Sequence, residues 1–312
     1  MSELDITIAG EINLDLILYG LPEQLPTERE LLASRFSMTL GSSSAIVAHN
    51  LAALGSRVGF ITKVGDDALG KMALERLSAS RVDLSRVVRA AGAASGVTVI
   101  LPHERERHIL TYLGTISELR FEDLDVEYLA SARHFHMSSL FLQRALAPRV
   151  HEVFQHMKNA GLTTSLDTND DPDDRWEGEL DATLPYVDIL LPNEREAMKM
   201  ARASDLETAV GQLSERVKTV VVKLGSRGAM ASTGGQRFIA PAANVRVVDP
   251  VGAGDSFDAG FLHQFLRGGD PQTCLVYGNL CGAFSTTASG GAEAFRDLKA
   301  MRQFFGKHGV SV

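Results

Sequence analysis

A glycine-rich turn next to an acidic residue is the segment of this sequence best suited to catalysis. The triplet Gly252-Ala253-Gly254 follows a β-branched run, and Asp255 comes next, at the start of a predicted helix. Backbone N–H groups at the start of a helix form an anion-binding site where glycines, which have no side chain, leave them accessible. An acid beside such a site suits proton transfer, so Asp255 is predicted to be a general base. The alternative is a tight turn in which Asp255 only favours the helix dipole.

Two polar side chains near the N-terminus are spaced to bind hydroxyl groups. Asn13 and Asp15 follow the first predicted strand, and strand alternation places them on one face. Amide and carboxylate groups form hydrogen bonds with the hydroxyls of a polyol. The pair is therefore a candidate substrate site, and a polar loop with Asx turns is the alternative.

An asparagine followed three residues later by a glutamate gives a third candidate. Asn193 and Glu196 come directly after the predicted strand 187–191. Because Mg²⁺ keeps several waters and needs few protein carboxylates, Glu196 could hold the ion through water. The same spacing is that of a capping box at a helix start, so both interpretations stay open.

In this order along the chain, these motifs resemble the signature of the ribokinase-like, or PfkB, family of carbohydrate kinases, over essentially all 312 residues. The resemblance implies that Asp255 accepts the proton of a sugar hydroxyl and that the N–H groups of 252–254 stabilise the transferred γ-phosphoryl group. It implies that Asp15, with Asn13 beside it, binds the sugar. ATP and Mg²⁺ are the implied cofactors, with Asn193 and Glu196 ordering Mg²⁺ and phosphates through water.

The resemblance also implies substrate contacts between these motifs. Gly41 and Asp167 lie at positions that contact the sugar in the family. Arg107 belongs to a basic turn, 103–108, that could reach over a sugar or a charged substrate. A solvated hairpin face is the alternative for this turn.

Nucleotide and cation contacts are implied in the second half of the chain. The segment 223–228, with Lys223, Gly225 and Gly228, looks like the family's nucleotide loop, and Asn279 begins the stretch that corresponds to the adenine-side wall. Some family members bind a monovalent cation such as K⁺ near the positions of Asp249 and Val251.

Three positions depart from the family pattern. Ser42 stands where the family has the second of two glycines, and Ile46 stands where it has an asparagine. Asp171 replaces the arginine of an Asp-x-Asn-x-Arg motif that begins at Asp167 and includes Asn169. We therefore expect an altered acceptor pocket, and the resemblance does not imply ribose or fructose as the acceptor.

The elements that must position these residues follow a regular pattern. Short β-branched runs alternate with amphipathic stretches, which is typical of βαβ units around a parallel sheet. We predict one α/β domain over 1–312, a ribokinase-like three-layer sandwich with a mostly parallel central sheet, helices on both faces, and the site at the carboxyl ends of the strands. The predicted strands are 5–9, 58–63, 133–137, 163–166, 187–191, 219–223 and 245–248. The predicted helices are 45–54, 68–79, 148–160, 194–203, 206–216, 254–266 and 271–288.

One region breaks the alternation. Residues 96–112 read as two strands around a charged turn with no helix between them. With the strand-like run 31–40 they predict a small β-sheet, and we interpret the segments 15–40 and 96–114 as a lid over the ligand. An edge hairpin is the alternative, and pairing of two lids into a homodimer stays open.

Composition excludes several other classes of protein. The net charge of −8 gives no global field to hold nucleic acid. The hydrophobic share of 45% and the charged share of 22% exclude a disordered or collagen-like chain. Cys274 and Cys281 are expected to be reduced core thiols of a cytoplasmic protein. The long uncharged stretches 36–56 and 271–292 are too rich in small polar residues to be membrane spans.

The sequence therefore predicts an ATP- and Mg²⁺-dependent kinase that phosphorylates a hydroxyl of a monosaccharide or related sugar. A nucleoside kinase of the same family, and a non-catalytic relative that binds sugar or nucleotide, are the alternatives. A dehydrogenase is disfavoured, because the first predicted strand runs into Gly10-Glu-Ile-Asn13 and not into Gly-x-Gly-x-x-Gly.

Overall fold

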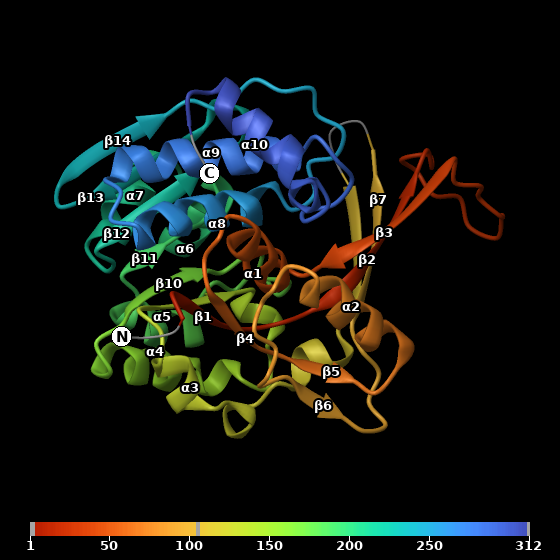
Figure 1. The fold of residues 1–312 in the computed structure, drawn as a ribbon, viewed down its shortest axis with the longest axis horizontal. Coiled ribbons are helices and arrows are strands. Elements are labelled where there is room, and N and C mark those ends of the chain that lie inside the picture. The colour runs from red at the N-terminus through yellow and green to blue at the C-terminus, as the bar shows by residue number, and fades with distance from the viewer. Residues whose placement is uncertain (1–3, 104–106, 311–312) are drawn as a thin grey trace.

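The computed structural model describes residues 4–103 and 107–310, and an eight-stranded sheet forms its centre (Figure 1). The strand order is β14-β13-β12-β11-β10-β9-β1-β4, and the pairs from β12 to β4 are parallel. The strands are β1 (Ile6–Ala9), β4 (Val58–Ile61), β9 (His134–Ser138), β10 (Thr163–Asp167), β11 (Ile189–Leu190), β12 (Thr219–Lys223), β13 (Ala229–Thr233) and β14 (Gln236–Ala240).

Helices cover both faces of this sheet (Figure 1). One apolar core joins the sheet to α1 (Ser43–Ala53), α2 (Ala68–Ser78), α8 (Ala253–Leu266) and α9 (Pro271–Ser285), with α10 (Leu298–Lys307) packed outside α9. A second core joins the other face to α3 (Val126–Ala130), α4 (Val150–Asn159), α5 (Glu179–Thr183), α6 (Glu194–Ala201) and α7 (Leu206–Ser214). The predicted three-layer α/β architecture is confirmed.

Local sequence explains why these segments fold as they do. The run 220–222 of β12 is buried on both faces, as continuous apolar strands of a parallel sheet are. Helix α4 buries Val150, Val153, Phe154 and Met157, which share one helical face. The buried apolar run of each strand and the buried apolar face of each helix thus mark where the strand ends and where the following loop begins.

A four-stranded sheet stands off the main sheet, as the sequence predicts. Its order is β3-β2-β7-β8, with β2 (Asn13–Tyr19), β3 (Arg35–Gly41), β7 (Val97–Pro102) and β8 (Arg107–Tyr112). A further pair is formed by β5 (Lys63–Gly65) and β6 (Val88–Ala90). Large apolar side chains remain exposed on the four-stranded sheet, namely Phe36, Ile109, Leu110 and Tyr112.

One strand prediction is wrong, and one hairpin was missed. Residues 245–248 form no strand: Val247 is 57% exposed, Val248 is 49% exposed, and the N–H of Val248 donates to the carbonyl of Thr286. The hairpin of β13 and β14 was not predicted. Its signal is Gly234-Gly235, both with positive φ, between two short alternating runs.

The expectation that both cysteines are core thiols is confirmed. Cys274 and Cys281 are free thiols and both are buried. His134 and His136 are buried and hydrogen-bonded to hydroxyls of strands β9 and β10, with Ser165 Oγ shared between them. Among the described residues, no helix is long and apolar enough to cross a membrane.

Candidate active site

A cavity of about 560 Å³ lies where the four-stranded sheet meets the loops after the central strands. Strands β2, β7 and β8 contribute one wall, and the start of α8 contributes another. The predicted site residues among its lining are Asn13, Asp15, Arg107, Glu196, Val251, Gly252 and Asp255. Residues that the sequence analysis gave no role also line it, among them Glu11, Ser43, Thr98, Ser139, Arg144 and Asp170.

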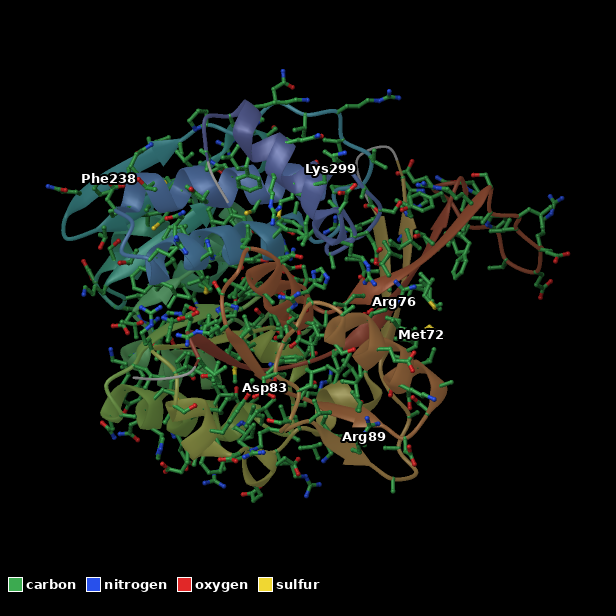
Figure 2. The ribbon with its side chains drawn as sticks, viewed as in Figure 1. Met72, Arg76, Asp83, Arg89, Phe238 and Lys299 are labelled. Atoms are coloured by element: carbon green, nitrogen blue, oxygen red, sulfur yellow. The ribbon has the colours of Figure 1, made fainter. Side chains whose placement is uncertain are left out.

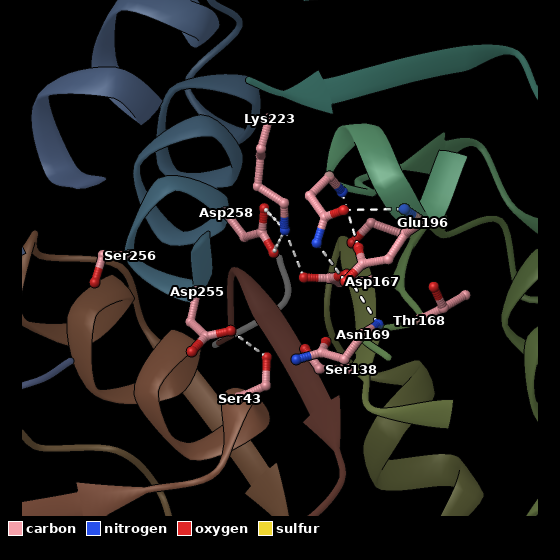
Figure 3. Close-up of polar contacts among 12 residues, drawn as sticks. Ser43, Ser138, Asp167, Thr168, Asn169, Glu196, Lys223, Asp255, Ser256 and Asp258 are labelled. Atoms are coloured by element: carbon pink, nitrogen blue, oxygen red, sulfur yellow. Dashed lines mark hydrogen bonds and ion pairs between the residues drawn. The ribbon is translucent and has the colours of Figure 1, made fainter. Parts of the chain in front are cut away.

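Asp255 stands in the first turn of α8 and points toward Ser43 at the start of α1 (Figure 3). Ser43 Oγ, at the start of α1, donates a hydrogen bond of 2.5 Å to Asp255 Oδ1. Burial raises the pKa of Asp255, and this hydrogen bond and the charge of Arg107 oppose the rise. An acid with a raised pKa and a fixed orientation is suited to accept a proton from a substrate hydroxyl.

The turn before Asp255 is built around glycine. Gly252 has φ of 73°, and an added Cβ would lie 2.3 Å from the Cα of Gly291 and 3.3 Å from Ile46 Cδ1. Only glycine fits this close approach of two backbones. Ile46, at the position of the family's asparagine, therefore packs against this turn. The first N–H groups of α8 have no acceptor within the helix and carry its positive dipole end, which suits a phosphoryl group.

Asn13 and Asp15 project from β2 into the same cavity. Asn13 Nδ2 donates to Thr98 Oγ1 at 2.7 Å, while Asn13 Oδ1 is buried and has no hydrogen-bond partner in the described structure. Burial, together with the charges of Asp255 and Asp249, raises the pKa of Asp15 to about 7. Both side chains thus keep hydrogen-bonding capacity that a polyol can use.

Gly41 lies directly opposite Asn13 in the register of β2 and β3. An added Cβ would lie 2.1 Å from Asp15 Oδ1 and 2.2 Å from Asn13 Oδ1. The glycine therefore makes room for both polar side chains.

Replacement of Gly41 by alanine is expected to raise the KM of the sugar acceptor about tenfold or more, because Asp15 and Asn13 must rotate away from the added methyl. The KM of ATP should stay within twofold. Steady-state kinetics with each substrate varied in turn measures both values. An unchanged acceptor KM would contradict the role of Gly41.

Ser42 occupies a backbone conformation that glycine prefers. Its φ of 69° and ψ of 135° lie outside the regions open to most side chains. This geometry explains why the family has a glycine at this position. The Ser42 hydroxyl is buried without a partner in the described structure and Ser42 lines the cavity, so this departure adds a polar group to the cavity.

A lysine whose side chain is 12% exposed links two buried carboxylates beside the cavity (Figure 3). Lys223 Nζ lies 2.6 Å from Asp167 Oδ2 and 3.1 Å from Asp258 Oδ2. Burial opposes the charge on Lys223, but the two carboxylates raise its pKa overall. Burial raises the pKa of Asp258. At Asp167 burial also acts to raise the pKa, but the charge of Lys223 and hydrogen bonds to the carboxylate together outweigh it, so the pKa there is lowered. Asp258 was not among the predicted residues, although it follows Asp255 by one helical turn.

Asn193 and Glu196 form the capping box of α6. The side chain of Asn193 accepts from the Glu196 N–H at 2.9 Å, and Glu196 Oε2 accepts from the Asn193 N–H at 2.8 Å. Burial and then the charge of Asp167 raise the pKa of Glu196 to about 7. Glu196 also lines the cavity, so the cap places this carboxylate at the site.

The residues around Glu196 fit Mg²⁺ held through water. Asn169 Oδ1 is buried with no partner in the described structure, and Asn169, Asp170 and Glu196 line the cavity together. Oxygen donors of this kind suit Mg²⁺, which keeps several waters. No group of three or more His, Cys, Asp or Glu side chains could hold a metal directly in the part of the chain described here.

Asp171 organises its own loop. Its carboxylate accepts hydrogen bonds from the N–H groups of Asp173, Arg175 and Trp176, at 2.9, 2.7 and 2.9 Å. Asp171 is 5% exposed and is absent from the lining of the 560 Å³ cavity. The acid that replaces the family's arginine therefore shapes the loop.

The residues predicted to bind nucleotide lie outside this cavity. Gly225 has φ of 59° in the turn after β12, and a Cβ on Gly228 would lie 2.1 Å from the carbonyl oxygen of Ala240. Asn279 Nδ2, on α9, donates to the carbonyls of Ala240 and Pro241. The structure brings this loop and α9 together, and nucleotide contact by Lys223, Gly225, Gly228 and Asn279 stays a prediction.

Asp249 is buried and held by several donors. Its Oδ1 accepts from the Val251 N–H at 3.0 Å, its Oδ2 accepts from the Gly290 N–H at 3.2 Å, and the Tyr19 hydroxyl lies 2.7 Å from Oδ2. This carboxylate ties the loop before α8 to the loop after α9 and to β2. Binding of a monovalent cation by Asp249 and Val251 stays a prediction.

Two arginines line the cavity without a counter-ion. Within the described residues, neither Arg107 nor Arg144 forms an ion pair, although the charge of Arg107 opposes the rise in the pKa of Asp15. Arg107 belongs to β8, and Arg144 follows β9 in an irregular segment. No sequence pattern marks Arg144. Residues 104–106, including the Arg105 of the predicted basic turn, lie outside the described residues.

Comparisons with known proteins agree with this geometry. The family model for pfkB family carbohydrate kinases matches residues 4–297. An ATP-dependent ribose-1-phosphate kinase of Halopiger xanaduensis is 32% identical, with 92% of this chain and 93% of that protein covered. A 2-dehydro-3-deoxygluconokinase of Bacillus subtilis is 29% identical, covering 87% of this chain and 88% of that protein.

Solved structures show the same fold. A structure from E. coli described as a ribokinase II in complex with ATP and Mg²⁺ superposes with a TM-score of 0.85 at 26% identity. The match covers 98% of this chain and 100% of that one. The family model spans the strands, the glycine turn and Asp255 alike, and so this chain belongs to the pfkB family of carbohydrate kinases.

Proposed function

We propose that this protein transfers the γ-phosphoryl group of ATP to a sugar hydroxyl, with Asp255 as the base. The observation that carries the proposal is the position of Asp255. It stands at the positive end of α8, beside the glycine turn, in a cavity that also contains Asn13 and Asp15. Phosphoryl transfer requires positioning and charge stabilisation more than covalent catalysis, and this arrangement offers both.

Each residue has a separate task in this proposal. Asn13 and Asp15 hold the sugar so that one hydroxyl points at Asp255, whose carboxylate takes its proton. The N–H groups of 252–254 stabilise the negative charge on the transferred phosphoryl group. Ser43 fixes the orientation of Asp255 through its hydrogen bond. When bound with ATP, Mg²⁺ neutralises phosphate charge, and Glu196 and Asn169 are the side chains that would hold its waters.

The acceptor carries a negative group in this proposal. Arg107 and Arg144 face the cavity without an ion-pair partner among the described residues. Guanidinium groups bind carboxylates and phosphates through paired hydrogen bonds. The names of the two sequence relatives, a ribose-1-phosphate kinase and a 2-dehydro-3-deoxygluconokinase, denote a phosphorylated sugar and a sugar acid. A cytoplasmic location and a homodimer formed through the four-stranded sheet stay predictions.

The test is ADP release from ATP and Mg²⁺ with a panel of acceptors. The panel contains sugar phosphates, keto-deoxy sugar acids, neutral pentoses and hexoses, and nucleosides. We expect turnover with an anionic sugar. Turnover with nucleosides alone would make the protein a nucleoside kinase, and ATP binding without turnover on any acceptor would favour a non-catalytic binding protein.

Replacement of both Arg107 and Arg144 by alanine is expected to raise the KM of the anionic acceptor by about 100-fold or more, since hydrogen bonds to charged groups contribute about 1.5–3 kcal/mol each and both arginines lose theirs. The kcat/KM of a neutral sugar should stay within about threefold, which makes that sugar the internal control. Equal losses for charged and neutral acceptors would show that the arginines support the fold of the cavity and not its specificity.

A further inference from the structure

A second cavity of about 510 Å³ shares no lining residue with the active site. It lies between the end of α1, the turn after α2 and the start of α10. Arg76 on α2 and Lys299 on α10 are labelled in Figure 2 and mark the two helices whose ends flank it. Its volume is within the usual range for sites that bind small organic molecules.

The lining of this second cavity is positively charged. Arg81, Arg296 and Arg302 line it, and no carboxylate does so among the described residues. In that same part of the chain, Arg81 and Arg302 form no ion pair, and Arg296 Nε lies 3.7 Å from a carboxylate oxygen of Glu293. Three arginines outnumber the one carboxylate, that of Glu293, which pairs with them among the described residues, and so they create a local positive potential that favours an anion.

The remaining wall is apolar. Ala52 and Ala53 of α1 face Phe295 and Leu298 around the same space. An inorganic ion would leave this apolar surface in contact with water. The lining therefore fits a ligand with one anionic group and an organic body.

His49 adds a buried hydrogen-bond acceptor. Asn50 Nδ2 donates to the carbonyl of Gly291 at 3.0 Å, which fixes the orientation of the amide. Asn50 Oδ1 then accepts from His49 Nδ1 at 2.9 Å, so Nδ1 carries the proton and Nε2 does not. His49 is 2% exposed and lines the second cavity, so Nε2 is the ring nitrogen left to accept a hydrogen bond there. Burial lowers the pKa of His49 to about 4, so the ring is neutral.

We propose that this cavity is a second ligand site, which binds a small phosphate monoester such as a nucleotide or a sugar phosphate. Arg81, Arg296 and Arg302 bind the phosphate, Phe295 and Leu298 contact the organic body, and His49 Nε2 accepts a hydrogen bond from a ligand hydroxyl. The proposal depends on this cavity alone and is independent of the reaction at Asp255.

Hydrogen bonds connect this site to the glycine turn. Asn50 Nδ2 also donates to Ser256 Oγ at 3.0 Å, and Ser256 Oγ donates to the carbonyl of Gly252 at 2.7 Å. A ligand that holds His49 therefore also holds Asn50 and the backbone of the turn that binds the phosphoryl group. Saturation of the second cavity is expected to change kcat.

Arg81 supplies a variant that preserves the fold. It has φ of 70° in the turn that follows α2, three residues beyond Ser78, a backbone conformation that favours glycine. Arg81→Gly removes the cation and relieves the backbone at the same time, so the melting temperature should not fall. In the double variant Arg81→Gly/Arg302→Ala, Arg296 is the one of the three arginines that remains. Arg89→Ala is the matched control, because Arg89 is exposed on β6 and outside the cavity (Figure 2).

The experiment is equilibrium dialysis of the full chain with AMP, ribose 5-phosphate and inorganic phosphate. We expect wild type and Arg89→Ala to bind one more equivalent of an organic phosphate than the double variant Arg81→Gly/Arg302→Ala. In wild type, the affinity of the second cavity for the organic phosphate should exceed its affinity for inorganic phosphate about tenfold or more. Equal stoichiometry and affinity in wild type and the double variant would overturn the site. Equal affinity for inorganic and organic phosphate would overturn the assigned ligand class.

The coupling has its own readout. Saturating probe should change the kcat of wild type by about twofold or more and leave that of the double variant unchanged. A kcat unaffected by the probe in both proteins would overturn the coupling. Since dialysis measures binding without turnover, failure of the second site and failure of the proposed kinase reaction are distinguishable.

Discussion

Replacement of Asp255 by asparagine is expected to lower kcat by about 10²- to 10⁴-fold, which is the range that a positioned general base contributes. Asparagine keeps the size of the side chain and can still contact Ser43, but it cannot accept the proton of the acceptor hydroxyl. The helix start and its N–H groups remain, so the affinity for ATP should change by less than about threefold. Steady-state kinetics and a nucleotide-binding titration on the same preparation separate the two effects.

Ser43→Ala is the matched control for Asp255→Asn. It removes the 2.5 Å hydrogen bond to Asp255 but leaves the carboxylate in place. Because the serine only orients the base, its loss should cost about tenfold in kcat or less, and it should raise the pKa of Asp255 further. The acid limb of the kcat/KM profile should then move to higher pH. A kcat for Asp255→Asn within tenfold of wild type would assign the base to another residue.

Local sequence was enough to predict the six parallel strands of the central sheet and the edge of that sheet at which the candidate site lies. Parallel strands buried on both faces leave continuous apolar runs, and the polar residues after such runs collect at one edge of the sheet. The departures of Ser42, Ile46 and Asp171 were visible too. Their consequences were not, since the φ of Ser42 and the three N–H groups around Asp171 exist only in the folded loops.

The partners of the site residues could not be predicted, because they come from distant parts of the chain. Ser43 and Asp255 are 212 positions apart. Lys223 meets Asp167 and Asp258 across 56 and 35 positions. Propensity and periodicity describe contacts within one element, whereas these pairs depend on how two elements pack. Lys223 was therefore interpreted from its loop motif alone, while its side chain holds two carboxylates together.

Those two carboxylates make Lys223 the residue whose loss should be most costly for stability. Its side chain is 12% exposed, and those of Asp167 and Asp258 are 3% and 0% exposed. Lys223→Met keeps the length of the side chain but leaves both acids without a cation. Removing one partner of a buried pair costs about 3–5 kcal/mol, because the remaining charge stays unpaired in a medium of low polarity. Urea unfolding at pH 8 measures the change in the free energy of unfolding.

The control is the double variant Lys223→Met/Asp258→Asn. An amide at position 258 removes one of the two unpaired charges, so the double variant should recover part of the lost free energy of unfolding. The pH dependence gives a second check. Without Lys223, the folded-state pKa of Asp167 rises above its value in the unfolded chain, and that of Asp258, which burial already raises, rises further. Stability then falls as pH rises through the folded-state pKa, and Lys223→Met should be closer to wild type at pH 5 than at pH 8. A loss below about 1 kcal/mol at pH 8, with no recovery in the double variant, would show that the acids are hydrated and that Lys223 is not their counter-ion.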